Sequence, residues 1–201
     1  MKDVTSIVFA GGLGTRLGGT KKALLDVGGK PVIHRVLAAL EPLSSHIIVV
    51  DNDASLAHLP GVTIVPDNET RAGVLVALAS GLSAAKGELC VVVACDMPFL
   101  DTTLLQWLIE QAADYDVVMP VNDGQMDPMH AVYRRATCLA AIESALARGE
   151  KRMISYLRDV RVREVHDVEL RARDPELRSF FNINTPEDLE LARSVATSAT
   201  H

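Results

Sequence analysis

The chain has 201 residues, of which 48% are hydrophobic and 23% charged, an ordinary composition for a globular protein that excludes extensive disorder. Acidic residues outnumber basic ones by 26 to 20, and because no basic stripe offsets the net charge of −6, nucleic acid is not expected as a partner. Three cysteines without C-x-x-C spacing indicate neither a disulfide framework nor a zinc site. The first residues run directly into a predicted strand rather than a signal peptide, and no apolar stretch reaches membrane-spanning length. We therefore expect a cytoplasmic protein with no membrane partner.

Apolar runs bounded by turn residues alternate with segments of helical periodicity along the chain. The predicted strands cover residues 6–9, 47–50, 63–65, 89–94, 117–120, 131–133 and 162–165. The predicted helices cover residues 31–40, 73–84, 102–113, 136–148 and 186–195. Strands that alternate with helices predict an α/β fold with a mostly parallel sheet. No internal linker stands out, so we expect one domain over residues 1–201 with a flexible tail at 196–201.

The segment after the first predicted strand is rich in glycine, with five glycines in residues 11–19. Glycines let backbone N–H groups turn inward and approach an anion closely. The pattern is neither a Walker A loop nor a Rossmann fingerprint, because Leu17 stands where the fingerprint needs its third glycine. It reads G-G-x-G-x-R-x-G, and it contributes Arg16, with Lys22 four residues beyond the last glycine of the pattern. A guanidinium and an ammonium group can offset a triphosphate and stabilise departing pyrophosphate. A plain surface loop is the alternative interpretation.

Two aspartates follow other predicted strands at the edge where ligands bind in such sheets. Asp96 comes after residues 89–94 and is well placed to hold Mg²⁺, which prefers one or two carboxylates together with phosphate oxygens and water. Asp67 occupies the equivalent place after residues 63–65. Either aspartate could instead be only a turn former, and this alternative is stronger for Asp67 because Pro66-Asp67-Asn68 also reads as a turn.

The glycine-rich segment resembles the signature of the nucleotidyltransferases that include sugar-phosphate and molybdenum-cofactor enzymes. That resemblance implies a Rossmann-like three-layer sandwich that transfers a nucleoside monophosphate and releases pyrophosphate. It also implies that Phe9, Ala10 and Gly11 lie beside the base and ribose. The residues implied around the triphosphate are Gly12, Gly14, Arg16 and Lys22. Asp67 is also counted among the nucleotide-binding residues, and Asp96 is the implied Mg²⁺ ligand.

Three later segments are similar to the molybdenum cofactor guanylyltransferase family in particular. They read Asp127-Pro-Met-His-Ala-Val-Tyr133, Gly149-Glu-Lys-Arg-Met153 and Phe181-Asn-Ile-Asn-Thr-Pro-Glu-Asp-Leu189. Together with Cys95-Asp-Met-Pro98, they extend the resemblance over nearly the whole chain. The implied substrates are GTP and the molybdenum-bearing pterin cofactor, and the product is the guanine dinucleotide form of that cofactor. The implied protein partners are molybdenum-insertion proteins and apo-molybdoenzymes.

Four side chains in these later segments are candidates for the acceptor side of the site: His130, Arg152, Asn182 and Asn184. Each has an ordinary structural alternative. His130 could be a core histidine and Arg152 a solvated helix residue. The two asparagines straddle Ile183 at the end of a predicted final strand, where they could instead satisfy backbone groups.

The sequence departs from the resembling family at two places. Lys21 stands where the family commonly has aspartate, which could alter phosphate or metal contacts. Residues 73–77 read Gly-Val-Leu-Val-Ala, whereas the family often has Gly-Pro-Leu-Ala-Gly, and this segment lies near the base. The resemblance therefore predicts the preference for guanine less directly than it predicts nucleotidyl transfer.

The resemblance predicts in-line attack of the acceptor phosphate on the α-phosphorus of GTP. Arg16, Lys22 and Asp96 would act through charge and position, and no general base is needed because phosphate is already a nucleophile. A cytidylyltransferase acting on the same pterin and a sugar-phosphate nucleotidyltransferase are alternatives within the class. A catalytically silent nucleotide-binding module is the alternative outside it.

Overall fold

The computed structural model describes residues 3–11, 17, 19–52, 54–66 and 73–198. Its main sheet has eight strands, seven of them in the order β10-β7-β9-β6-β1-β4-β5, with β8 paired to β7. Their bounds are β1 (Val4–Phe9), β4 (His46–Val50), β5 (Val62–Val65), β6 (Leu89–Ala94), β7 (Val117–Asn122), β8 (Gln125–Met126), β9 (His130–Arg134) and β10 (Val162–His166). The pairs β5–β4, β4–β1, β1–β6 and β7–β10 are parallel, whereas β9 runs antiparallel between β6 and β7. The prediction of a mostly parallel sheet is confirmed.

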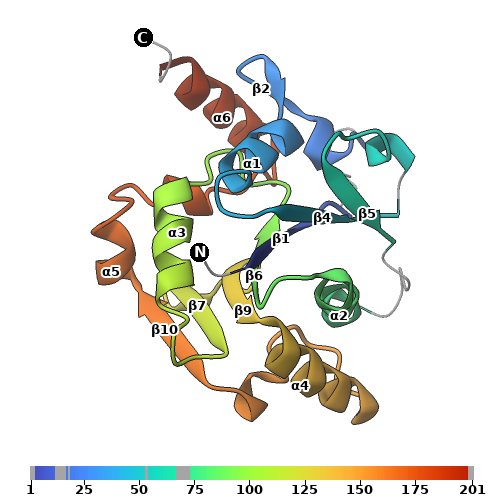
Figure 1. Ribbon diagram of the computed structural model, residues 1–201. Coiled ribbons are helices and arrows are strands. Elements are labelled where there is room, and N and C mark those ends of the chain that lie inside the picture. Colours follow the sequence, from blue (N-terminus) through green and yellow to red (C-terminus); the bar gives the residue numbers. More distant parts are fainter. Residues whose placement is uncertain (1–2, 12–16, 18, 53, 67–72, 199–201) are drawn as a thin grey trace.

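Helices cover both faces of this sheet, which makes three layers (Figure 1). Their bounds are α1 (Val32–Leu40), α2 (Val74–Ala84), α3 (Thr102–Glu110), α4 (Arg135–Ala147), α5 (Asp167–Arg171) and α6 (Pro186–Ser198). In Figure 1, α1, α3 and α6 lie on one side of the sheet and α2 and α4 on the other. The α/β sandwich predicted from the sequence is thus confirmed.

The two faces of the sheet bury separate apolar clusters because neighbouring residues of a strand point in opposite directions. In β1, Val8 packs in the cluster that contains α1, α3 and α6, whereas Ile7 packs in the cluster that contains α2 and α4. Both residues are fully buried. A central strand covered on both sides has no face in contact with solvent, which is why 89–94 reads as a continuous hydrophobic run.

Short elements are where the structure departs from the sequence-based expectation. The hairpin of β2 (Asp26–Val27) and β3 (Lys30–Pro31) was not predicted, because two-residue strands carry no periodicity. Its turn uses Gly28 and Gly29 at φ of +63° and +76°, the left-handed values that a two-residue hairpin turn requires. Short 3-10 turns form η2 (Lys22–Leu24), η3 (Ala54–Leu56), η4 (Leu157–Asp159) and η5 (Arg178–Phe180).

The C-terminal part of the chain corrects two expectations. Residues 182–184 do not form a strand, because Ile183 donates its backbone N–H to Asp96 O, at 3.0 Å, instead of joining a ladder. Helix α6 continues to Ser198, and Ala196 is buried, so residues 196–198 are helical where a flexible tail was expected. Thr185 and Asp188 cap this helix: Asp188 N–H donates to Thr185 Oγ1 at 3.2 Å, and Thr185 N–H donates to Asp188 Oδ2 at 2.8 Å.

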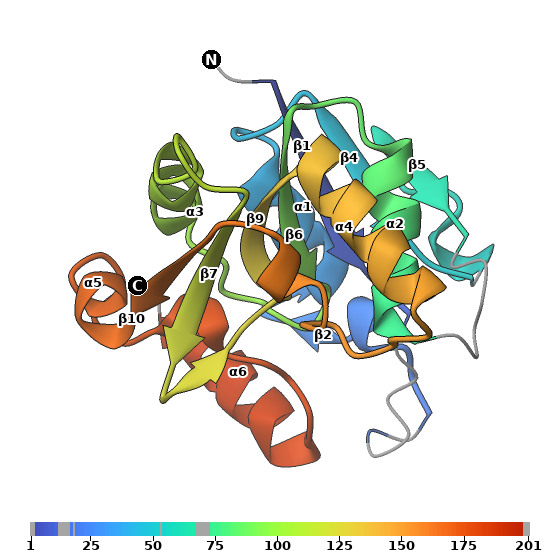
Figure 2. The same cartoon turned by 90° about the horizontal axis from the view of Figure 1, so that it is seen from below.

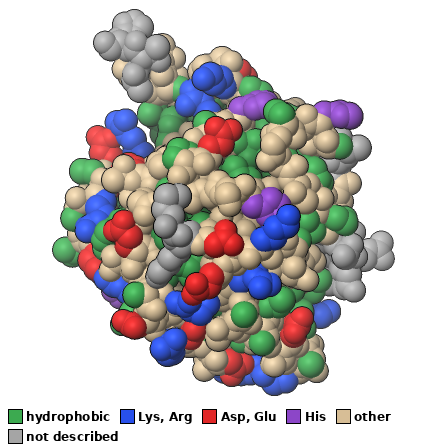
Figure 3. Space-filling model, in the orientation of Figure 1, with side chains coloured by type: hydrophobic (Ala, Val, Ile, Leu, Met, Phe, Trp, Pro, Cys, Tyr) green, Lys and Arg blue, Asp and Glu red, His purple; other side chains and the backbone are tan. Residues whose placement is uncertain are grey.

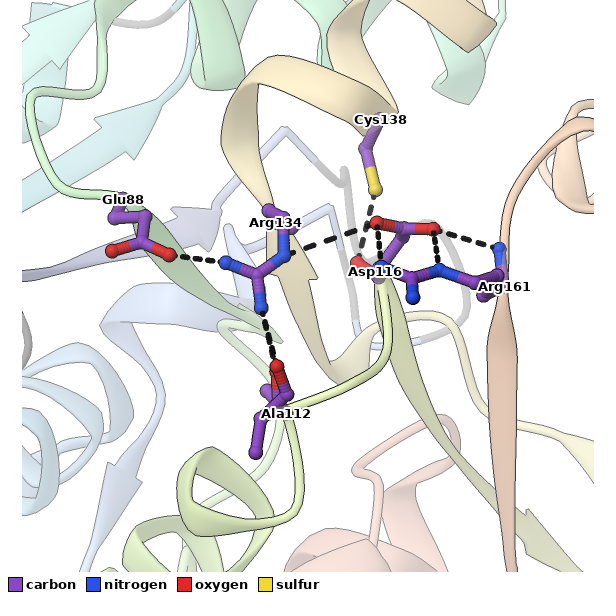
Figure 4. A network of polar contacts seen from close by, with 7 residues as sticks. Glu88, Ala112, Asp116, Arg134, Cys138 and Arg161 are labelled. Carbon is purple, nitrogen blue, oxygen red and sulfur yellow. Dashed lines mark hydrogen bonds and ion pairs between the residues drawn. The ribbon is translucent and has the colours of Figure 1, made fainter.

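A polar network ties the strands together at the edge where the parallel strands begin (Figure 4). Asp116 precedes β7 and is 5% exposed. Its carboxylate accepts hydrogen bonds from Arg161 Nε at 3.2 Å and from the Arg161 backbone N–H at 2.9 Å. Arg134, at the end of β9, lies 3.8 Å from Asp116 Oδ1 and also pairs with Glu88. This network stabilises the edge of the sheet opposite to the ends of the parallel strands.

On the face seen in Figure 3, acidic and basic side chains are interspersed, with apolar side chains between them. Among the described helices, none combines the length and the apolar character needed to cross a membrane.

Candidate active site

The carboxyl ends of the three central strands converge at one edge of the sheet. Phe9 lies beside Val50 of β4 and Ala94 of β6 in register. Ala10 N–H donates to Val50 O at 3.0 Å, and Cys95 N–H donates to Phe9 O at 2.9 Å. In Figure 2 the arrow of β7 points toward this edge of the sheet, and α6 lies beyond it. The N-terminus lies at the opposite edge of the sheet in the same view. The chain that follows each strand therefore contributes side chains to a shared site.

Lys22 joins two of these segments through its ammonium group. Its Nζ donates to Asp96 Oδ2 at 2.9 Å and to Asn184 Oδ1 at 2.7 Å. Lys22 and Asp96 each keep 17% of the side chain exposed, so the pair remains open to solvent. Ile183 N–H bonds to Asp96 O, which fixes the 182–184 segment against the end of β6. Three of the residues singled out in the sequence thus meet at one point.

Asp96 has the donor atoms that a divalent cation requires. One carboxylate oxygen is held by Lys22, and the other, Oδ1, is buried and has no hydrogen-bond partner among the described residues. A buried oxygen of this kind is costly unless a cation or another donor satisfies it. Within the described residues, no three His, Cys, Asp or Glu side chains cluster as metal ligands. The arrangement fits a cation that takes one or two carboxylates from the protein and its other ligands from phosphate and water.

Asp127 is a second acidic residue at this edge, and it had no assigned role in the sequence. Because β9 is antiparallel to β6 and pairs His130 with Val93, the residues just before β9 lie where β6 ends. Burial raises the pKa of Asp127, a hydrogen bond from Met129 N–H lowers it, and the charge of Asp96 raises it further. The signal in the sequence was an aspartate shortly before a strand, but the position of that aspartate depends on the direction in which the strand runs.

Lys21 points away from Lys22 and pairs with a different carboxylate. Its ammonium group donates to Asp51, the first residue after β4. Lys21 keeps only 7% of its side chain exposed and Asp51 only 3%. The lysine that departs from the family pattern is therefore part of a buried ion pair.

His130 is a core histidine in this structure. Its side chain is fully buried and stacks on Phe180, with ring centroids 4.3 Å apart. Nε2 lies 3.3 Å from Ser179 Oγ, and burial lowers the pKa of the imidazole to about 3. The neutral ring packs inside the protein, so the structural alternative accounts for His130 and we do not retain it on the acceptor side.

Asn182 and Arg152, two further acceptor-side candidates, do not contact the Lys22–Asp96 pair through any hydrogen bond or ion pair in the described part of the chain. Asn182 donates from Nδ2 to Phe180 O at 2.9 Å, which is the backbone-satisfying role given above as its alternative, so we do not retain it either. Arg152 is exposed in the segment after α4. Gly73 directly precedes α2, and a Cβ atom at this glycine would lie 3.6 Å from the backbone carbonyl oxygen of Lys151, the neighbour of Arg152. The segment that contains Arg152 therefore lies beside the start of α2.

The nucleotide-binding candidates at the end of β1 are only partly described. Phe9 is half-buried, Ala10 is buried and Gly11 is exposed. The remaining candidates lie outside the described residues: Gly12, Gly14, Arg16 and Asp67.

The protein is thus a three-layer α/β sandwich with a lysine–aspartate pair at the carboxyl ends of its central strands. Residues 6–164 match the family described as the MobA-like NTP transferase domain, and the chain belongs to this family. It is 35% identical to a probable molybdenum cofactor guanylyltransferase of Pelotomaculum thermopropionicum, over 99% of this chain and 96% of that protein. It is 36% identical to a molybdenum cofactor guanylyltransferase of Desulfosudis oleivorans, over 96% of each chain.

Solved structures show the same fold. The crystal structure of molybdopterin-guanine dinucleotide biosynthesis protein A from Archaeoglobus fulgidus has a TM-score of 0.81 and 28% identity, covering 96% of this chain and 99% of that one. A 2-C-methyl-D-erythritol 4-phosphate cytidylyltransferase from Thermus thermophilus has a TM-score of 0.73 at 22% identity, covering 97% and 99%. The second likeness concerns the fold alone.

Proposed function

We propose that this enzyme transfers GMP from GTP to the phosphate of the molybdenum-bearing pterin cofactor and releases pyrophosphate. The observation that carries the proposal is the meeting of Lys22, Asp96 and Asn184 at the carboxyl edge of the sheet. Its support is the similarity, over nearly the full length, to relatives named for this activity. The product would serve apo-molybdoenzymes, and molybdenum-insertion proteins would act beside it.

In the proposed reaction, a phosphate oxygen of the acceptor forms a bond to the α-phosphorus of GTP while the bond to pyrophosphate breaks. The acceptor oxygen is already anionic, so no proton has to be removed and no protein base is required. Catalysis then consists of positioning and of offsetting charge. This requirement matches a site built from an ammonium group, a carboxylate and an amide rather than from a nucleophile and a base.

Asp96 is the residue we assign to Mg²⁺, through the buried Oδ1 for which the described part of the chain offers no hydrogen-bond partner. Asp96 would hold the ion, and bound Mg²⁺ would supply positive charge to offset that of the triphosphate. Lys22 keeps the Asp96 carboxylate neutralised through Oδ2, and its other two N–H groups can reach a triphosphate oxygen and Asn184. Asn184 orients the ammonium group from the acceptor side.

The remaining assignments rest on the sequence pattern. We place the base and ribose beside Phe9, Ala10 and Gly11, which follow β1 at the same edge. Gly12, Gly14 and Arg16 are assigned to the phosphates from the G-G-x-G-x-R motif, and Asp67 to the nucleotide. Arg152 remains a candidate for the phosphate of the pterin, because it is exposed in a segment that lies beside the start of α2.

The decisive experiment supplies each of the four nucleoside triphosphates with Mg²⁺ and the pterin cofactor, followed by mass analysis of the product. We expect the guanine dinucleotide cofactor together with one pyrophosphate for each transfer. A product formed tenfold faster with CTP would assign another base within the same class, and a sugar nucleotide formed in parallel mixtures with a sugar phosphate in place of the pterin would assign another acceptor. GTP binding without pyrophosphate release from any mixture would identify a silent nucleotide-binding module and overturn the proposal.

A further inference from the structure

Two consecutive lysines extend to opposite sides of the central strand. Lys21 has an extended backbone, with φ of −61° and ψ of 124°, so its side chain and that of Lys22 diverge. Lys21 reaches Asp51 at the end of β4, and Lys22 reaches Asp96 beyond the end of β6. Because β1 lies between β4 and β6, the two ion pairs straddle the end of β1.

The two pairs differ in their burial. Lys21 and Asp51 are almost completely enclosed, whereas Lys22 and Asp96 remain partly open to solvent. A buried ion pair is held tightly because neither charge can separate from the other without being left unpaired in an apolar environment. An open pair can exchange partners at low cost. The Lys21–Asp51 ion pair is therefore fixed in place, whereas Lys22 and Asp96 can exchange each other for a ligand.

The main chain transmits this fixed position to Lys22. Leu24 N–H donates to Lys21 O at 3.0 Å, which closes the turn of η2 that Lys22 begins. Ala23, within that turn, is fully buried. With Lys21 anchored on one side and Ala23 packed in the core on the other, the Lys22 side chain leaves the backbone from a defined point.

We propose that Asp51 is a positioning residue for this enzyme. Through Lys21 it holds the main chain from which Lys22 extends, and it thereby aims the Lys22 ammonium group at Asp96 and Asn184. The charge of Lys21 is matched by Asp51, so Lys22 is the member of the lysine pair that meets the triphosphate. The inference rests on the proposed function only for its activity measurement.

Asp51→Asn tests the proposal, with Asp116→Asn as the matched control. Both aspartates are buried, ion-paired and adjacent to a strand of the same sheet, but Asp116 belongs to the network at the opposite edge (Figure 4). The first measurement is the rate at which acetic anhydride modifies the Lys22 amine, followed by mass analysis of the peptide at a temperature where both variants are folded. We expect modification of Lys22 to accelerate in Asp51→Asn and to stay at the wild-type rate in Asp116→Asn.

The second measurement is the kinetics of transfer per folded molecule. Misplacing Lys22 should lower kcat/KM for GTP on the order of tenfold to a hundredfold in Asp51→Asn. Asp116→Asn should lower the melting temperature with normal kinetics. The reversed pair, Lys21→Asp with Asp51→Lys, restores an ion pair and should return Lys22 modification toward the wild-type rate.

Several results would overturn the positioning role. One is equal Lys22 modification and turnover in the two single variants, and another is a folded reversed pair that still behaves like Asp51→Asn. Failure of Asp51→Asn to fold where Asp116→Asn folds would also overturn it, since the pair would then support the whole fold. If wild-type enzyme transfers no nucleotide but Asp51→Asn still selectively exposes Lys22, the proposed function fails and the positioning role stands.

Discussion

The ammonium group of Lys22 lies 2.9 Å from the carboxylate of Asp96, although the two residues are 74 positions apart in the chain. The contact spans the ends of two neighbouring strands and also reaches Asn184. In this arrangement the carboxylate and the amine offset each other before a triphosphate arrives. Each of the three residues can therefore be tested separately.

Asp96→Asn should keep the shape of the side chain and remove its charge. We expect transfer to slow by roughly 10²–10³-fold, which is the usual cost of losing one charge-stabilising group in an active site. Because Asp96 is partly exposed, the melting temperature should change little. The measurement is kcat at saturating Mg²⁺ and substrates, and near wild-type turnover there would remove Asp96 from the metal site.

Lys22→Ala should remove the ammonium group that we assign to the triphosphate. We expect kcat/KM for GTP to fall on the order of 10²-fold, because the charge of the leaving pyrophosphate loses a partner. Lys22 lies at the edge of the sheet with part of its side chain in contact with solvent, so the fold should persist. Lys22→Arg is the charge-preserving control and should retain more activity than the alanine variant. Equal loss in both variants would point to geometry rather than charge.

Asn184→Ala and Asn182→Ala form a matched pair, because only Asn184 contacts Lys22. We expect Asn184→Ala to slow transfer to the pterin while GTP binding and melting temperature change little. Asn182→Ala loses a hydrogen bond to Phe180 O and should lower the melting temperature slightly, with normal turnover per folded molecule. Steady-state kinetics and thermal unfolding on both variants check this. The reverse ranking of the two variants in turnover would show that the wrong asparagine has been assigned to the site.

His130→Gln should change how stability depends on pH. The folded-state pKa of His130 is lowered to about 3 by burial, below the ordinary value of 6.5. The neutral ring therefore contributes its full stability above pH 6.5, and this contribution is lost progressively as pH falls from 6.5 toward 3. The loss should be on the order of 1 kcal/mol per pH unit. Glutamine does not titrate, so the variant should lack this part of the acid sensitivity.

Urea unfolding at pH 7 and pH 5 measures the predicted difference for His130. The wild type should lose more of its free energy of unfolding between these two values than the variant does. Transfer per folded molecule should stay normal in His130→Gln, because the ring faces Phe180 and Ser179 in the core. If the free energy of unfolding fell by the same amount between pH 7 and pH 5 in both proteins, the claim that burial keeps His130 neutral would be wrong.

Local sequence determined most of the secondary structure, because the signals for it are local. The apolar run at 89–94 and the periodicity of the segment that becomes α1 come from the faces each element must bury. The start of α3 is also set locally, because Asp101 caps the helix by accepting a hydrogen bond from Thr103 N–H at 2.7 Å. The lysine, the aspartate and the glycine-rich segment were recognisable as parts of a phosphate site because ligands bind beyond the carboxyl ends of parallel strands.

Only the tertiary structure decided which side chains meet. The pairing of Lys21 with Asp51 and of Lys22 with Asp96 depends on β1 lying between β4 and β6, and strand order leaves no trace in local periodicity. Because β9 runs antiparallel to β6, Asp127 lies at the edge of the sheet where the candidate site forms. The same strand direction brings His130 near this edge, where packing against Phe180 buries its ring. These contacts join residues tens of positions apart, so they arise from how the strands are ordered and packed rather than from the pattern of any single segment.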